Sequence, residues 1–250
     1  MYCIDNDRER FARRFDWCID SMIPCYFEGH IGSAFAEREK DPRWVILRSG
    51  DFFFAAGEPE NIDEAVRDLI RPGSVVIPED MKWLDAITAC GAEAGPYTRY
   101  RTKMPENGLD RKRLEEYLNV PGCVSIRPAG EAEYPLLRDC GWENCFVSNF
   151  GGMEDFLENG FGYCVFVGNE LASAATTYGY YSGGYELQIA TAPKFRRRGY
   201  AAIAGAAFLL ECLGRGKLPH WDAANQTSVR LAQRLGYEYG GEYLAISMKG

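Results

Sequence analysis

Residues 185–207 read YELQIATAPKFRRRGYAAIAGAA, which predicts an apolar strand, an arginine-rich turn and a helix that begins at a glycine. Leu187, Ile189 and Ala190 are typical of a buried strand. Gly199 lets backbone amides come close to a ligand at the start of the helix. The small residues that follow predict close packing of this helix against a sheet.

The turn of this segment is predicted to bind an anion. Arg196, Arg197 and Arg198 place formal charge beside the N–H groups at the helix start, where the helix dipole is also positive. A phosphate or pyrophosphate would be held there from several directions. A basic triplet alone is more typical of a solvated charge cluster, but the strand, the Arg-x-x-Gly-x-Ala turn and the small-residue helix together favour a binding site.

Length and composition indicate a globular protein. The chain has 250 residues, 46% of them hydrophobic, which is enough for one large domain or two modest ones. It contains no run of about 18 apolar residues, and the N-terminal stretch MYCIDNDRERFARRFDW is charged where a signal peptide would be apolar. We expect a cytoplasmic location and no membrane partner.

Charge, cysteine and histidine content exclude several classes of function. A formal net charge of -8 and a pI near 5.0 argue against a nucleic-acid partner. Nine cysteines, odd in number and without a Cys-x-x-Cys pair, predict reduced and mostly buried thiols. His30 and His220 are the two histidines, and neither has metal-ligand spacing to other residues, so we predict no metal.

The order of expected elements suggests two α/β regions. Residues 1 to about 40 are expected to be helical, and two apolar runs around residues 49–51 predict a hairpin. A charged helix within residues 105–121, interpreted as a solvated surface helix, marks the boundary. The predicted domains are therefore residues 1–121 and 122–250, and the last residues of the second region are expected to form a pair of strands.

The second region resembles the GNAT N-acetyltransferase superfamily. Arg196, Gly199 and Ala201 fit the superfamily pattern Gln/Arg-x-x-Gly-x-Gly/Ala, and the element order of residues 124–250 is similar to the complete domain. The resemblance implies an α/β (α+β) GNAT fold whose central mixed, mostly antiparallel sheet is splayed at an acyl-CoA site. The first region is either a degenerate GNAT-like half or an unrelated α/β cap.

A narrower resemblance comes from four runs in order, ELQIAT, RRRGYA, ECL and WDAANQTSVRLAQRLGY. Together they look like the zwittermicin-A-resistance type of GNAT acetyltransferase, a bacterial group with an extra N-terminal region. The superfamily implies acetyl-CoA (coenzyme A) as cofactor, with strand residues along the pantetheine, loop residues on the pyrophosphate, and two residues reaching it from the neighbouring strand and helix. The residues carried over are Ile189, Ala190, Thr191, Arg196, Arg197, Arg198, Gly199, Tyr200, Ala201, Asn225 and Ser228.

The acid–base groups are less clearly marked than the cofactor site. Glu186 is the leading general base because it lies on the strand that follows the cofactor, and Asp222 is the other candidate. Their alternative roles are a rim carboxylate and a loop anchor. Many relatives carry a tyrosine where this chain has Ala232, so the leaving thiolate would be protonated by Tyr237, by a tyrosine of the cluster 178–181 or by water.

Two functions follow from this pattern. The first is an N-acetyltransferase that moves an acetyl group directly from acetyl-CoA to a primary amine of a small molecule, such as an amino-containing antibiotic or metabolite. The alternative is a non-catalytic acyl-CoA-binding or sensor protein, which the missing tyrosine favours. A homodimer is left open by the sequence.

Overall fold

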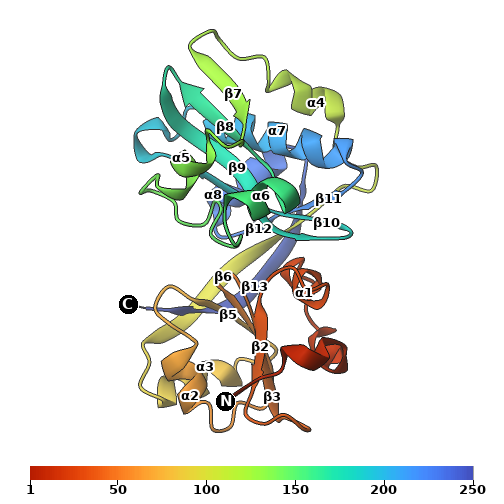
Figure 1. Cartoon of the computed structure of the whole chain (residues 1–250), viewed down its shortest axis with the longest axis vertical. Helices are drawn as coiled ribbons and strands as arrows, with labels where there is room; N and C mark the ends of the chain where they lie inside the picture. The colour runs from red at the N-terminus through yellow and green to blue at the C-terminus, as the bar shows by residue number, and fades with distance from the viewer. Residues whose placement is uncertain (250) are drawn as a thin grey trace. The chain divides into compact units, whose positions relative to one another are not determined.

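The computed structural model describes residues 1–249, which form two compact units (Figure 1). One unit comprises Met1–Arg99 together with the segment from Glu242 onward, and the other comprises Tyr100–Gly241. These units divide the chain at points different from the predicted boundary after residue 121. Residues 100–121 belong with the second unit, and the end of the last strand belongs with the first.

The first unit is a sheet with short helices between its strands. Its elements are β1 (Tyr2–Cys3), the 3-10 helix η1 (Asp5–Phe15), α1 (Met22–Phe27), β2 (Ser33–Ala36), β3 (Trp44–Ser49), β4 (Phe52–Gly57), α2 (Asp63–Asp68), β5 (Val75–Pro78), α3 (Lys82–Ala89), the start of β6 (Ala94–Lys103) and the end of β13 (Glu238–Met248). The strand order is β1-β2-β3-β4-β5-β13-β6. β4 and β5 run parallel, and β13 lies antiparallel to β5.

Strand β2 lies within the N-terminal residues that were predicted to be helical, and the alternation of its side chains explains this difference. In β2 the side chains of Ala34 and Ala36 are buried while Ser33 and Phe35 are partly exposed, which is the two-residue period of a strand. The predicted hairpin is confirmed, because Ser49 pairs with Phe52 across a tight turn. Helices therefore occupy only part of residues 1–40.

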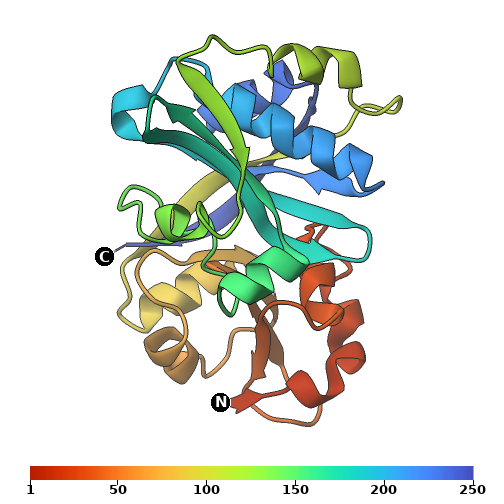
Figure 2. The same ribbon diagram turned by 45° about the horizontal axis from the view of Figure 1, so that its top comes forward.

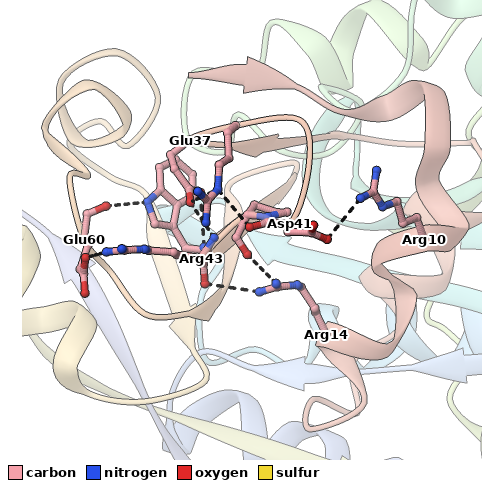
Figure 3. A network of polar contacts seen from close by, with 9 residues as sticks. Arg10, Arg14, Glu37, Asp41, Arg43 and Glu60 are labelled. Carbon is pink, nitrogen blue, oxygen red and sulfur yellow. Dashed lines mark hydrogen bonds and ion pairs between the residues drawn. The ribbon is translucent and has the colours of Figure 1, made fainter.

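A polar network ties η1 to the connection between β2 and β3 (Figure 3). The Arg14 guanidinium donates to the carbonyl oxygens of Arg43, at 3.3 Å, and of Pro42. The Glu37 carboxylate accepts from the backbone N–H of Arg43, and the Arg43 side chain pairs with Glu60. Because side chains satisfy its backbone groups, this connection holds a defined conformation without being a strand or helix.

The second unit is a five-stranded sheet with helices on both faces (Figures 1 and 2). Its elements, besides the shared β6 and β13, are α4 (Arg111–Glu116), β7 (Val124–Pro128), α5 (Tyr134–Arg138), α6 (Met153–Asn159), β8 (Gly162–Val167), β9 (Glu170–Tyr181), β10 (Gly184–Thr191), the 3-10 helix η2 (Pro193–Phe195), α7 (Tyr200–Gly214), β11 (Leu218–His220), β12 (Asp222–Ala223) and α8 (Gln226–Arg234). The strand order is β11-β10-β9-β8-β7. β10 and β11 run parallel, and the other neighbours run antiparallel.

Gly205 lets helix α7 pack closely against the end of α8 and against strand β10 of this sheet. A Cβ atom added at Gly205 would lie 2.8 Å from the Leu235 side chain and 3.2 Å from Ile189. On the opposite face, Leu137 of α5 and Phe156 of α6 are buried against strands β8 and β9. The final strand β13 is continuous from Glu238 to Met248, so the predicted pair of strands there is wrong.

Two absences hold across residues 1–249. None of their helices is both long and apolar enough to cross a bilayer. Their His, Cys, Asp and Glu side chains form no group of three or more that could hold a metal ion. Among the cysteines, Cys25, Cys164 and Cys212 are buried while Cys3 and Cys123 are exposed, so the prediction of mostly buried thiols holds only for some of them. Burial raises the pKa of Cys164 to about 12, which makes that thiol unreactive.

Helix α4 supplies a core side chain to the second unit, unlike the solvated helix predicted there. Leu114 is fully buried in the cluster that includes Phe208 and Leu235.

We expect Leu114→Ala to destabilise the second unit by about 2–5 kcal/mol, measured by hydrogen exchange of amides in β9 and α7. The exposed Lys112→Ala is the control, and a loss below about 0.5 kcal/mol for Leu114→Ala would contradict this role of α4.

Candidate acyl-CoA site

Strand β10 separates from its parallel neighbour part-way along its length. Residues 184–186 pair with residues 218–220, although β10 continues to Thr191. Beyond Trp221 the chain forms β12, which pairs with β6 instead. Among the strands of residues 1–249, none pairs with the edge of β10 from residue 187 onward, so the predicted splay of the sheet is confirmed.

Pairing with β9 decides which backbone groups face this open edge. The Ala192 N–H donates to the Ala172 carbonyl at 2.9 Å, and bonded and non-bonded residues alternate along an antiparallel pair. The N–H and C=O groups of Ile189 and Thr191 therefore point away from β9, whereas those of Ala190 point toward it. An extended amide-containing chain could add to this edge as a strand does.

The arginine loop turns through two left-handed residues. Arg197 has a φ of 65° and Gly199 a φ of 88°. This conformation is unusual for arginine and costs about 1–2 kcal/mol. Helix α7 then begins at Tyr200 without a side-chain cap, and its first bond runs from the Ala202 N–H to the Gly199 carbonyl. The N–H groups of Tyr200 and Ala201 precede that bond and are donors for an anion.

A cavity of about 690 Å³ lies beside this loop. It is bounded by the end of β10, the loop, the first turn of α7 and one side of α8. Of the residues predicted to bind a cofactor, Arg198 does not line the cavity. Those that do are Ile189, Ala190, Thr191, Arg196, Arg197, Gly199, Tyr200, Ala201, Asn225 and Ser228.

Asn225 and Ser228 also have structural roles. Asn225 caps α8, because its Oδ1 accepts from the N–H groups of Thr227 and Ser228, each at 3.0 Å. The Ser228 hydroxyl accepts from the indole N–H of buried Trp221 at 2.9 Å. The run that begins WDAAN thus links the start of α8 to the chain at β12. Because the Oδ1 of Asn225 is used by the cap, a contact of Asn225 with a ligand would use its Nδ2.

Some residues lining the cavity were not predicted from the sequence. Trp142 and Glu143 come from the connection between α5 and α6, where no motif marks them. Arg230 and Arg234 come from α8, and their four-residue spacing behind the Asn225 cap is a signal that could have placed both on one helix face. The other unpredicted lining residues are Phe195, Ala202, Thr227 and Leu231.

Glu186 lies where the two strands part. Its side chain is 6% exposed, and its Oε1 accepts from the Asp222 N–H at 3.0 Å. A β-bulge follows at once, between Glu186 and Leu187. The hydrogen bond to Asp222 fixes the orientation of the carboxylate, and the bulge changes the direction of the strand before it reaches the cavity.

Tyr237 occupies a structural position. Its hydroxyl donates to the Pro219 carbonyl at 2.9 Å and is buried. Burial, with smaller effects of the Cys212 and Glu186 charges, raises the pKa of Tyr237 well above its usual value. This arrangement favours packing over the predicted role as general acid. Ala232 is buried in the same cluster.

In the tyrosine cluster 178–181, Tyr181 contacts a titratable side chain. The Tyr181 hydroxyl lies 2.8 Å from Nε2 of His220. Tyr180 instead stacks on Phe150, and Tyr178 is buried. Burial lowers the pKa of His220, so the imidazole is neutral near pH 7.

The His220 environment predicts acid sensitivity. Its pKa is below 6.5 when folded, so the unfolded chain takes up the proton first and the folded state loses stability as the pH falls below about 6.5. His220→Gln should therefore lose less unfolding free energy than the wild type between about pH 7.5 and pH 5 in urea titrations. His30→Gln, which also removes one imidazole, is the control. An acid-side loss equal to that of the wild type in His220→Gln would contradict the expectation.

The chain belongs to the GNAT acetyltransferases. The profile of the family described as GNAT acetyltransferase matches residues 13–246 and so covers both units, beyond the residues 124–250 of the sequence resemblance. It is a family of transferase enzymes, and the mixed sheet splayed beside an arginine loop agrees with this membership.

The chain is similar to a curated protein and to several solved structures. An uncharacterized N-acetyltransferase of Bacillus subtilis, YdfB, is 30% identical over 150 residues, which are 59% of this chain and about half (51%) of that relative. The crystal structure of a GCN5-related N-acetyltransferase-like protein from Streptococcus suis has a TM-score of 0.88 at 28% identity, covering 98% of this chain and 100% of that one. A tandem GNAT protein from the clavulanic acid biosynthesis pathway matches in fold, with a TM-score of 0.51 at 10% identity, over 99% and 97% of the chains.

The loop geometry predicts the effect of a side chain at Gly199. A Cβ there would meet no protein atom within 4 Å, but it would stand at the mouth of α7. We expect acetyl-CoA to raise the Tm of the wild type and Gly199→Val to abolish that shift. Gly216→Val, at the other end of the same helix with a φ of 66° and open space around it, is the control. An acetyl-CoA shift that persists in Gly199→Val would contradict the placement of the pyrophosphate.

Proposed function

We propose that this protein transfers an acetyl group from acetyl-CoA to a primary amine of a small molecule. The observation that carries the proposal is the coincidence of three features in one unit. They are the open edge of β10, the uncapped start of α7 behind the arginine loop, and a fixed carboxylate where β10 leaves β11. Acetyl-CoA would supply a thioester as the acyl donor.

The residues of the cavity suit the parts of this donor. Backbone groups of Ile189 and Thr191 would pair with pantetheine amides along the open edge. The Tyr200 and Ala201 N–H groups, with Arg196 and Arg197, would hold the pyrophosphate. Arg198 does not line the cavity, and its proposed part is to add positive potential next to it.

Glu186 is proposed as the group that takes the proton of the attacking amine, directly or through a water. The carboxylate is held by the Asp222 N–H, so it needs no reorganisation before it accepts a proton. The part proposed for Asp222 is therefore to position Glu186 through its backbone. His220, whose Nε2 contacts the Tyr181 hydroxyl, lies opposite Glu186 in the pairing of β10 with β11.

The acceptor is proposed to be an amino-containing antibiotic or related metabolite. The support is the series of runs ELQIAT, RRRGYA, ECL and WDAANQTSVRLAQRLGY, which together resemble the zwittermicin-A-resistance type. Asn225 and Ser228 of the last run line the α8 side of the cavity, and Trp221 supports Ser228 through a hydrogen bond. Release of CoA thiol with a panel of amines that includes zwittermicin A tests both the reaction and the acceptor class.

We expect Glu186→Gln to lower kcat/KM by about 100-fold or more, because a positioned general base contributes about 100- to 10,000-fold. The amide keeps the shape of the side chain, so the affinity for acetyl-CoA should change little. Thiol release and calorimetric binding measure the two quantities. The control is Glu115→Gln, which replaces an exposed carboxylate on α4 by a carboxamide in the same way.

Two results would contradict this assignment. A loss smaller than about tenfold at every pH would remove Glu186 as the base. Acetyl-CoA binding without thiol release for any amine would instead support the alternative of an acyl-CoA-binding or sensor protein.

A further inference from the structure

Two arginines of α8 line the same cavity as the arginine loop. Arg230 and Arg234 lie one helical turn apart, and the cavity is also lined by Arg196 and Arg197. Like charges at this spacing weaken a helix slightly. A bound anion would reverse the effect, because both guanidinium groups could then share one negative partner.

The charge of the cavity exceeds what a pyrophosphate needs. Four guanidinium groups and the single carboxylate of Glu143 give a formal sum of +3, in a chain whose net charge is -8. A pyrophosphate diester carries two negative charges, and a phosphate monoester adds about -1.5 to -2 at pH 7. The cation count therefore suits a ligand that carries a third phosphate.

Helix α4 holds Arg234 in place before any ligand binds. The Arg234 Nε donates to the Tyr117 hydroxyl at 3.3 Å, and its guanidinium lies 5.5 Å from the centre of the Tyr117 ring. The Arg234 carbonyl accepts from Arg113 at 2.7 Å and from the Tyr117 hydroxyl at 3.2 Å. Both the backbone and the side chain of Arg234 are thus positioned, which lowers the ordering cost of binding an anion.

Arg230 is oriented within its own helix. Its Nη2 lies 3.2 Å from the Thr227 hydroxyl, and Thr227 also lines the cavity. The first turn of α8 therefore directs Arg230, and α4 directs Arg234. Each of these two arginines on one wall of the cavity thus has its own orienting contact, which a solvated surface arginine does not need.

We propose that Arg230 and Arg234 bind the 3′-phosphate of the acyl donor, with Tyr117 as the positioning residue for Arg234. The two arginines would then make the protein favour coenzyme A over its 3′-dephospho form. This inference rests on the proposed function, because it takes the pyrophosphate to lie on the loop at residues 196–199.

Calorimetric titration with CoA and with 3′-dephospho-CoA at one fixed salt concentration tests the inference. The wild type should bind CoA at least about tenfold more tightly, the effect of one good charge-assisted contact. Arg230→Gln/Arg234→Gln should bring the two affinities within about twofold of each other, with little change for dephospho-CoA. Arg138→Gln, which removes an exposed arginine paired with Asp139, is the matched control and should keep the wild-type ratio.

Tyr117→Phe separates positioning from packing. The phenyl ring keeps the packing, while loss of the hydroxyl releases the Arg234 side chain, so the ratio should fall part of the way and dephospho-CoA affinity should hold. A merely structural role would weaken both ligands alike. Equal wild-type affinities, or an unchanged ratio in the double variant, would overturn the inference while leaving the proposed function in place. If neither ligand binds the wild type, the proposed function falls and the inference with it.

Discussion

The short pairing between β10 and β11 is the constraint on which the candidate site depends. After Glu186 the two strands lose their shared hydrogen bonds, and the backbone of β10 must find other partners or a ligand. One side chain bridges the point of separation, through the bond from Glu186 to the Asp222 N–H. The same divergence leaves room beside the arginine loop for the cavity, so sheet geometry and anion binding have a common origin.

The loop and the fold class could be predicted because their signals are local. Gly199 is needed where φ is 88°, and the small residues after it allow α7 to approach Ile189 and Leu235. The turn at Gly199 and the close packing of α7 both depend on small side chains that lie near one another in the sequence. The left-handed Arg197 could not be predicted, because nothing about an arginine favours a φ of 65°.

Long-range packing explains what the sequence did not reveal. The low apolar content of α4 predicts a solvated helix, yet Leu114 is buried. Tyr117 contacts Arg234, which lies more than a hundred positions away in the sequence. Tyr237 fitted the role of an acid by residue type alone, and only its bond to Pro219 shows how its proton is held. Trp142 and Glu143 lie in a connection without periodicity, so pattern analysis has no means of finding them.

The order of residues along the chain has a consequence for its synthesis. The sheet of the first unit is completed by β13, in which Ile246 pairs with Val76 and Met248 is buried beside Trp83. The ribosome synthesises this part of β13 only after the whole segment 100–241. During synthesis the edge of β5 that pairs with β13 is therefore without this partner until the residues of the second unit have been made, and an unpaired strand edge favours association with other chains.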